Sequence, residues 1–439
     1  MENQGIRDAR KLGTSKILVL GLQHMFAMFG ATVLVPALTG LSVSATLLFA
    51  GLGTLLFHFL AKGKVPAFLG SSFAYLAGYA AIAPKGEAAL LPYACVGVAC
   101  SGLLYLVLAA LVKSFGTQRV MRFFPPIVTG PIIICIGMTL ANSAINNCNG
   151  SWGIALIAIA TVVIFSIWGK GMFRIIPILM GVLVSYAAAA VMGKVDFSGV
   201  ASAAWIGMPV KMENTVFSLI GNCDTNLLIT AIIAIMPIAF ATMIEHIGDI
   251  CAISSTVGEN FIEDPGLHRT LMGDGIATTV ASLFGAPANT TYGENTGVLA
   301  LTKVYDPLVV RIAAVFAILA SFCPKFSALV SAMPVGTIGG VSLILYGMIS
   351  AIGVRNLVEN HVDLTKSRNV MVASLIMSLA LGITFSAAGA ISFTVGSFTL
   401  RFSGLAVAAI VGIVLNAILP ENDFVFSSEY KHGKPEERD

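Results

Sequence analysis

The sequence predicts an all-α polytopic membrane protein with about fourteen transmembrane segments, arranged as two inverted repeats of seven. Of its 439 residues, 57% are hydrophobic and only 11% are charged, whereas a soluble protein of this size carries about 25% charged residues. Apolar runs of roughly 20 residues, the length that crosses a bilayer, recur along the chain. The placement of lysine and arginine relative to these runs is the third observation.

The predicted segments follow one another with short connections. The first seven are residues 17–38, 45–61, 65–83, 88–112, 126–144, 153–168 and 175–192. The second seven are residues 227–253, 270–284, 286–301, 309–323, 336–352, 370–387 and 402–419. The longest connection, residues 193–226, separates the halves, and an odd number of segments in each half inserts them in opposite orientations.

The positive charges test this topology. With fourteen segments, 20 of the 25 lysine and arginine residues fall on the side of the two termini. The positive-inside rule then places both termini in the cytoplasm. We expect the chain to lie in the inner (plasma) membrane, surrounded by lipid. The net charge of +3 follows from this topology, so it gives no indication of nucleic-acid binding.

Two segments at corresponding positions of the halves are interrupted. The third reads VPAFLGSSFAYLAG and the tenth reads APANTTYGENTGVL. Both open with Pro-Ala, cross a small polar patch and reach an aromatic residue, Phe73 or Tyr292, before an apolar helical pattern begins. Interrupted segments at matching positions are the best sequence indication of a transporter's binding site.

The polar stretch of the tenth segment favours an extended backbone. It contains the β-branched pair Thr290 and Thr291 and then Gly293, after which the pattern turns helical at Glu294. An extended piece that runs into a half-helix exposes free backbone N–H groups, which a bilayer tolerates only where they line a cavity or are buried in protein. This stretch therefore predicts half of a binding site.

Carboxylates within apolar segments are the other chemical signal. Glu245 and Asp249 lie four residues apart in the eighth segment, on one helix face. Because charges that face lipid are costly, they are expected to face a cavity, unless this stretch is solvated near a helix end. Together with Glu294 they are candidates for substrate binding and proton coupling, or for a sodium site. In the first half, His24 is the corresponding polar residue and is expected to support the site.

Enzyme classes find no support in the sequence. It contains no Walker A pattern, no HExxH and no GxSxG, and its seven cysteines lack metal-binding spacing. We therefore expect no enzymatic activity, no cofactor and no metal. A secondary transporter for a small polar solute is the predicted function, with an ion channel or a membrane enzyme as the alternative class.

Several long motifs resemble the nucleobase–ascorbate transporter (nucleobase–cation symporter) family. They are QHMFAMFGATVLVP, LGSSFAY, EHIGD, DPGLHRT, NTTYGEN and GGVSLILYG, and they extend along nearly the whole chain. The resemblance implies short β-strands in segments three and ten and a homodimer. It also implies a core domain (residues 1–113 and 227–325), a gate domain (114–193 and 326–420), an inter-repeat link (194–226) and a cytoplasmic tail (421–439).

The resemblance also implies a substrate and the residues that bind it. The chain would be a proton-coupled symporter that imports uracil by alternating access of the two domains. Glu245 and Glu294 would be the carboxylates that hydrogen-bond the substrate. Phe73, Tyr292 and Gly293 would supply aromatic walls and backbone groups, and the supporting residues would be His24, Ser72 and Asn295. Either Glu245 or Asp249 would carry the proton.

One position departs from the pattern of uracil-transporting members. They carry histidine four residues after the first site glutamate, whereas this chain has Asp249, as purine-transporting members do. Purine-transporting members in turn carry glutamine where this chain has Glu294. A xanthine or urate symporter, coupled to protons or sodium, is therefore the alternative.

Overall fold

The computed structural model describes residues 5–395 and 398–420, so the predicted cytoplasmic tail, 421–439, lies outside the described residues. The first-half elements are η1 Ala9–Leu12, α1 Thr14–Thr39, α2 Val43–Leu60, β1 Leu69–Ser71, η2 Phe73–Tyr75, α3 Leu76–Ile82, α4 Leu91–Phe115, α5 Thr117–Met121, α6 Pro126–Asn149, α7 Trp152–Trp168, α8 Met172–Ile175 and α9 Pro177–Val191. The connection between the halves contains α10 Ser198–Ser202, η3 Met212–Asn214 and η4 Val216–Leu219.

The second half is also mainly helical. Its elements are α11 Thr225–Ile235, η5 Met236–Ile238, α12 Ala239–Val257, η6 Ile262–Gly266, α13 Leu267–Leu283, β2 Asn289–Thr291, α14 Glu294–Thr302, α15 Pro307–Ser321, α16 Pro324–Ser331, α17 Val335–Glu359, α18 Ser367–Thr384, β3 Ala390–Val395, β4 Phe398–Ser403 and α19 Gly404–Ile418. Every predicted segment coincides with a helix or with a strand followed by a helix.

Several of these helices can cross a membrane by length and composition. Among the described residues there are seven, namely α1, α2, α4, α6, the continuous stretch Thr225–Val257, α17 and α18. The pair α15 and α16, bent by 87°, makes an eighth if it forms one span, and α7, α9 and α19 are apolar but shorter. The predicted polytopic helical membrane protein is thus confirmed, while the count of fourteen and the inverted repeats stay predictions.

Two local features differ from the predicted pattern. The eighth segment divides into α11 and α12 around a 3-10 turn at Pro237, because proline lacks the N–H that would continue the helical ladder. A second antiparallel hairpin, β3–β4, joins α18 to α19, where we predicted only a connection. The alternation of Ile391, Phe393 and Val395 with polar residues is the period of a strand and explains it.

The helices pack in two groups. In the first, α4 packs along α13, α2 packs against α13 and α15, and α1 packs along α15. In the second, α6 packs along α17, α7 packs against α9 and α17, and α18 and α19 pack on each other and on α6. Glycines permit the close approach of α6 and α17, since a Cβ added at Gly353 would lie 2.7 Å from the carbonyl oxygen of Gly130.

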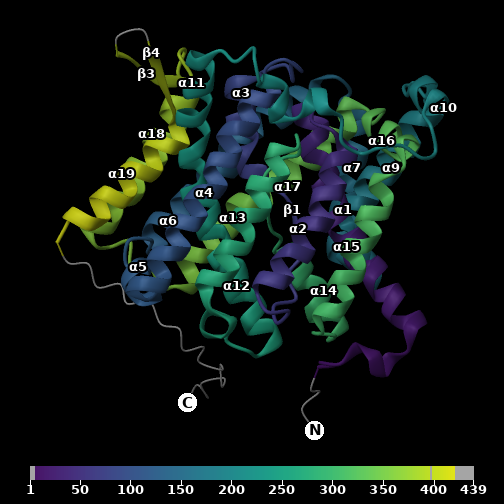
Figure 1. Ribbon diagram of the computed structural model, residues 1–439, viewed down its shortest axis with the longest axis horizontal. Coiled ribbons are helices and arrows are strands. Elements are labelled where there is room, and N and C mark those ends of the chain that lie inside the picture. The colour runs from purple at the N-terminus through teal and green to yellow at the C-terminus, as the bar shows by residue number, and fades with distance from the viewer. Residues whose placement is uncertain (1–4, 396–397, 421–439) are drawn as a thin grey trace.

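The two ends of the molecule carry different connections (Figure 1). The hairpin β3–β4 and α10 lie at the upper end in this view, whereas α5, α14 and the end of α12 lie at the lower end. The N-terminal segment is tied to α14 and α15: Ile6 N donates to Lys303 O (2.7 Å) and Ala9 N donates to Asp306 Oδ2 (2.8 Å). Asp306 also caps α15 by accepting from Leu308 N (2.9 Å).

Replacing Asp306 by alanine is expected to lower the free energy of unfolding by about 1–2 kcal/mol, because it removes a helix cap and the acceptor for Ala9 N. The measurement is the thermal unfolding midpoint of the purified protein in detergent. Asp306→Asn, which keeps one side-chain acceptor, should lose less. An unchanged midpoint for the alanine variant would show that neither bond contributes.

Candidate functional site

The two interrupted segments meet as a buried strand pair. Strand β1 pairs antiparallel with β2, with Gly70 opposite Thr290 at the centre. Each strand then leads into helix, β1 through η2 into α3 and β2 through Tyr292 and Gly293 into α14. All residues of both strands are buried. The prediction of strands in segments three and ten is therefore confirmed, and residues more than 200 positions apart in the sequence lie side by side.

Helix α12 brings the predicted carboxylates to this strand pair. It packs against both β2 and α14. Glu245 and Asp249 lie one turn apart on it, and both are half-buried. Glu294 is the first residue of α14, but its side chain lies outside the part of the chain that the structure describes.

Gly293 lies directly beside Asp249. A Cβ added at Gly293 would be 2.8 Å from Asp249 Oδ1, closer than side chains tolerate. Gly293 is exposed and immediately precedes α14, so its backbone is accessible next to a carboxylate. The structure therefore brings together Asp249 and Gly293, two of the predicted site residues.

The two predicted aromatic residues are buried and make specific contacts. The Phe73 ring meets the ring of Tyr346 on α17 edge to face, with centroids 6.2 Å apart. Tyr292 reaches back to the first half, where its hydroxyl donates to Ser71 O at 2.6 Å and lies 3.2 Å from Ser71 Oγ. The Tyr292 hydroxyl thus ties the residue after β2 to the end of β1.

Replacing Tyr292 by phenylalanine is expected to lower the free energy of unfolding by about 1–3 kcal/mol, because the buried carbonyl of Ser71 loses its donor. Thermal unfolding in detergent measures this change. Tyr93→Phe on α4 serves as a comparison. The Tyr93 hydroxyl accepts a hydrogen bond from Asp224 N at 2.8 Å, and this bond lies nearer the surface. If Tyr292→Phe left the unfolding midpoint unchanged, the hydroxyl would not tie the two strands.

The three predicted supporting residues are all buried. Ser72 extends the strand ladder, since its N–H donates to Ala288 O at 3.0 Å. His24 on α1 and Asn295 on α14 belong to packed helices. Neither side chain has a hydrogen-bond partner among the described residues, so the structure gives no direct contact for a supporting role.

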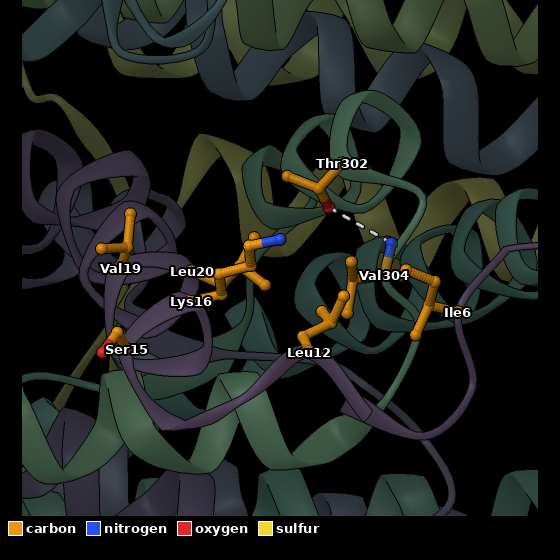
Figure 2. Close-up of a pocket in the computed structure, with 8 residues that line it drawn as sticks. All are labelled: Ile6, Leu12, Ser15, Lys16, Val19, Leu20, Thr302 and Val304. Carbon is orange, nitrogen blue, oxygen red and sulfur yellow. Dashed lines mark hydrogen bonds between the residues drawn. The ribbon is translucent and has the colours of Figure 1, made fainter. Parts of the chain in front are cut away.

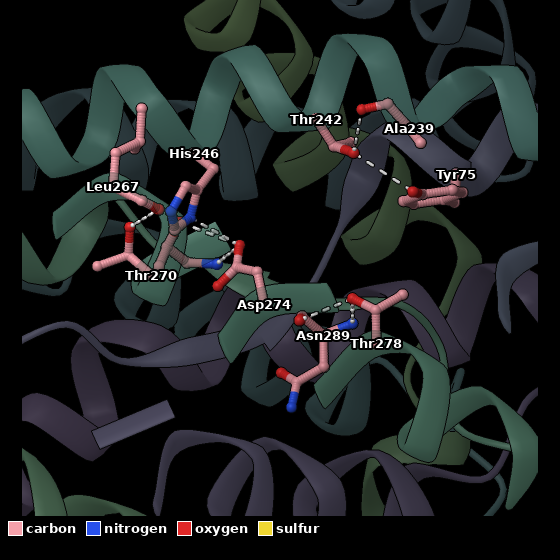
Figure 3. Close-up of polar contacts among 10 residues, drawn as sticks. Tyr75, Ala239, Thr242, His246, Leu267, Thr270, Asp274, Thr278 and Asn289 are labelled. Carbon is pink, nitrogen blue, oxygen red and sulfur yellow. Dashed lines mark hydrogen bonds and ion pairs between the residues drawn. The ribbon is translucent and has the colours of Figure 1, made fainter. Parts of the chain in front are cut away.

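A buried polar network behind the strands was not predicted (Figure 3). His246 Nδ1 lies 2.9 Å from Asp274 Oδ2 and 3.1 Å from Thr291 Oγ1, and Thr291 N donates to the same Asp274 oxygen at 3.1 Å. Both side chains of the His246–Asp274 pair are fully buried. A carboxylate only accepts, so Nδ1 carries the hydrogen. This network joins α12, α13 and β2.

The sequence contains a signal for this network. Asp274 lies inside the apolar ninth predicted segment, and an acidic residue within a membrane segment indicates a functional site by default. His246 lies between the two predicted carboxylates, Glu245 and Asp249. The sequence does not show that His246 pairs with Asp274, because α12 and α13, the helices that carry them, come together only in the folded structure.

A separate pocket of about 440 Å³ lies at the N-terminal segment (Figure 2). It is lined by Ile6, Leu12, Ser15, Lys16, Val19, Leu20, Thr302 and Val304. None of the predicted site residues lines it. It therefore adds nothing to the strand-pair site.

Comparison with known proteins identifies the family. A family model described as the Permease family, which corresponds to the nucleobase–ascorbate transporters, matches residues 15–389. This chain belongs to the nucleobase–ascorbate transporter family. The predicted resemblance is confirmed, as is the prediction of a transporter rather than an enzyme.

Several members of the family with high similarity are uracil permeases. The uracil permease of Bacillus caldolyticus is 42% identical over 92% of both chains, and that of Bacillus subtilis is 40% identical over 95% of both chains. The uracil permease of Escherichia coli (strain K12) is 38% identical over 91% of this chain and 90% of its own.

Solved structures support the fold of this family member. The transmembrane domain of the cyanobacterial bicarbonate transporter BicA superposes with a TM-score of 0.60 at 14% identity, covering 94% of this chain and 99% of that one. SLC26A9 superposes with a TM-score of 0.63 at 12% identity, covering 91% and 64%. At these identities the similarity concerns the fold alone.

Proposed function

We propose that this nucleobase–ascorbate transporter imports uracil across the cytoplasmic membrane by proton symport, with alternating access of a core domain against a gate domain. The observation that carries the substrate is the set of uracil permeases that are 38–42% identical over nearly the whole chain. Both termini would lie in the cytoplasm, and the protein would form a homodimer.

The chemistry of the strand-pair site supports a pyrimidine. The edge of uracil alternates N–H donors with C=O acceptors, so carboxylates together with backbone groups complement it. Glu245 would accept from a ring N–H, as would Glu294. The exposed backbone at Gly293, at the start of α14, lies beside the Asp249 carboxylate.

The packing of the helices supports two moving parts. The group α1, α2, α4, α13 and α15 corresponds to the proposed core domain, and the group α6, α7, α9, α17, α18 and α19 corresponds to the proposed gate domain. Phe73 and Tyr346 meet where the two groups face one another. Uracil bound near Phe73 would therefore lie at the boundary of the domains and move with the core.

Glu245 and Asp249 are the proposed proton carriers. Both are half-buried within α12, and carboxylates in membrane proteins form proton relays because the charged form is costly there. Protonation of one of them on loading would remove a charge from the core before it moves. Release of the proton to the cytoplasm would restore the charge and promote release of uracil.

The test is uptake of labelled uracil in cells that lack their own uracil transporter. It is run at acidic and alkaline pH, with and without a protonophore and excess xanthine. We expect saturable uptake that rises at acidic pH, is abolished by the protonophore and is unaffected by xanthine. Uptake blocked by xanthine, or no uracil uptake, would overturn uracil as the substrate and favour a purine.

The role of Glu245 is tested in the same assay. Glu245→Gln is expected to remove the pH dependence and weaken uracil binding, while Glu213→Gln serves as the control because the Glu213 side chain is 74% exposed in the inter-repeat link. Wild-type affinity and pH dependence in Glu245→Gln would exclude Glu245 as the proton carrier. The same comparison with Asp249→Asn assigns the proton to one carboxylate.

A further inference from the structure

A two-stranded sheet inside a membrane protein has two outer edges whose backbone groups need partners. In an antiparallel pair, alternate residues direct their N–H and C=O groups away from the partner strand. Tyr292 N donates to Phe68 O (2.9 Å), which fixes which residues face inward. The outward-facing residues are Ala67, Leu69 and Ser71 on one edge and Asn289 and Thr291 on the other.

The edge of β1 is held by helix α2. Leu69 N donates to Thr54 Oγ1 at 2.9 Å, and the Thr54 hydroxyl lies 2.7 Å from Ala50 O and 3.4 Å from Leu69 O. One turn later, His58 Nε2 lies 2.8 Å from Ala67 O. Thr54 and His58 are both buried, so these backbone groups have no access to water.

The edge of β2 is held by helix α13 in the same way (Figure 3). Thr278 Oγ1 donates to Asn289 O at 2.9 Å and accepts from Asn289 N at 3.2 Å. One turn earlier, Asp274 Oδ2 accepts from Thr291 N at 3.1 Å. Each strand is therefore held by two buried side chains, four residues apart, on the helix that precedes it in the sequence.

The hydrogen-bonding roles of His58 follow from its neighbours. Arg311 Nε donates to His58 Nδ1 at 3.3 Å, and an arginine has no acceptor to offer. Nδ1 must therefore accept, which leaves the hydrogen on Nε2, where it is donated to Ala67 O. Arg311 Nη2 also donates to Gly63 O at 3.2 Å, which holds the guanidinium in place. Arg311 on α15 thus fixes the tautomer of His58, the α2 residue that donates to the strand.

We propose that Thr54, His58 and Thr278 are positioning residues that fix the strand pair to α2 and α13, and so hold the backbone that contacts the substrate in one geometry. This inference rests on the proposed function for its substrate. Without these bonds, the outward groups of Leu69, Ala67 and Asn289 would be buried without partners. The strands would shift to satisfy them, displacing Gly293 and the start of α14 relative to Glu245.

The experiment uses isosteric variants of the full chain in detergent. Thr54→Val and Thr278→Val remove the hydroxyl and keep the side-chain shape, whereas Thr54→Ser and Thr278→Ser restore the hydroxyl. His58→Gln keeps a donor near the position of Nε2, whereas His58→Leu removes it. The matched control is Thr161→Val on α7, whose buried hydroxyl donates within its own helix, to Ile157 O at 2.7 Å.

Two measurements are made on each variant, hydrogen exchange of residues 65–72 and 286–292 and equilibrium binding of labelled uracil. For the valine and leucine variants we expect exchange to accelerate and the uracil Kd to rise, each by about tenfold, the effect of leaving one buried donor or acceptor unpaired. The serine and glutamine variants and the control should stay within about twofold of the parent.

The two measurements separate this inference from the proposed function. Absence of uracil binding by the parent chain would overturn the proposed substrate, while accelerated strand exchange in the valine variants would still support the positioning role. Unchanged exchange in the valine and leucine variants would overturn the positioning role even if uracil binds. His58→Leu keeps Thr54, so it tests the β1 edge even if Thr54→Val yields no folded protein.

Discussion

Replacing Asp274 by leucine is expected to abolish uptake and to lower the free energy of unfolding by about 3–5 kcal/mol. Asp274 is fully buried and accepts hydrogen bonds from His246 and from the backbone of Thr291 through the same oxygen. Removing the carboxylate leaves the buried Thr291 N–H without its acceptor, and the buried His246 imidazole keeps Thr291 Oγ1 at 3.1 Å in place of its charged partner. Because the network joins α12 to β2, the carboxylates on α12 would also lose their position relative to the strand pair.

Thermal unfolding in detergent and uracil uptake measure these losses, with Asp196→Asn in the exposed inter-repeat link as the control. The double variant His246→Leu/Asp274→Leu should be destabilised by less than the sum of the single variants, since replacing both polar partners by apolar groups leaves fewer unpaired groups. Additive losses would show that His246 and Asp274 act independently. An Asp274→Leu protein as stable as its parent would contradict the importance of the network.

Replacing Gly293 by alanine is expected to raise the uracil Kd by about tenfold or more, an affinity loss of about 1.4 kcal/mol, with little change in stability. The added methyl group would lie 2.8 Å from Asp249 Oδ1, so the carboxylate must rotate away from the position that it holds in the structure. Gly293 is exposed, so the substitution does not overfill the buried core. The loss would therefore fall on binding rather than on folding.

Equilibrium binding of labelled uracil measures this change, and an Asp249→Ala background tests its cause. If the methyl group acts by displacing the carboxylate, Gly293→Ala should have little further effect once that carboxylate is gone. The control is Gly382→Ala on α18, where an added methyl group meets no described atom within 4 Å beyond the adjacent residues and the backbone of its own helix. An equal loss in both backgrounds would show that Gly293 acts through some other contact.

The sequence by itself determined the class of the protein and the position of the two interrupted segments that form the strand pair. Composition and apolar runs predict a polytopic membrane protein because lipid requires long apolar helices. The Pro-Ala openings and the polar patches predict the extended pieces that form β1 and β2, because proline, glycine and β-branched residues act on the backbone locally. The spacing of Glu245 and Asp249 predicts one shared helix face for the same local reason.

Tertiary structure alone decided which side chains meet. His246, Asp274 and Thr291 come from three elements, and their contact depends on how α12, α13 and β2 pack. Thr54 and Thr278 are ordinary helix residues in the sequence, and only the packing of α2 and α13 against the strand pair places their hydroxyls at its outer edges. Local preferences select helix or strand, but hydrogen-bond partners far apart in the sequence are selected by packing, since every buried polar group must find one there.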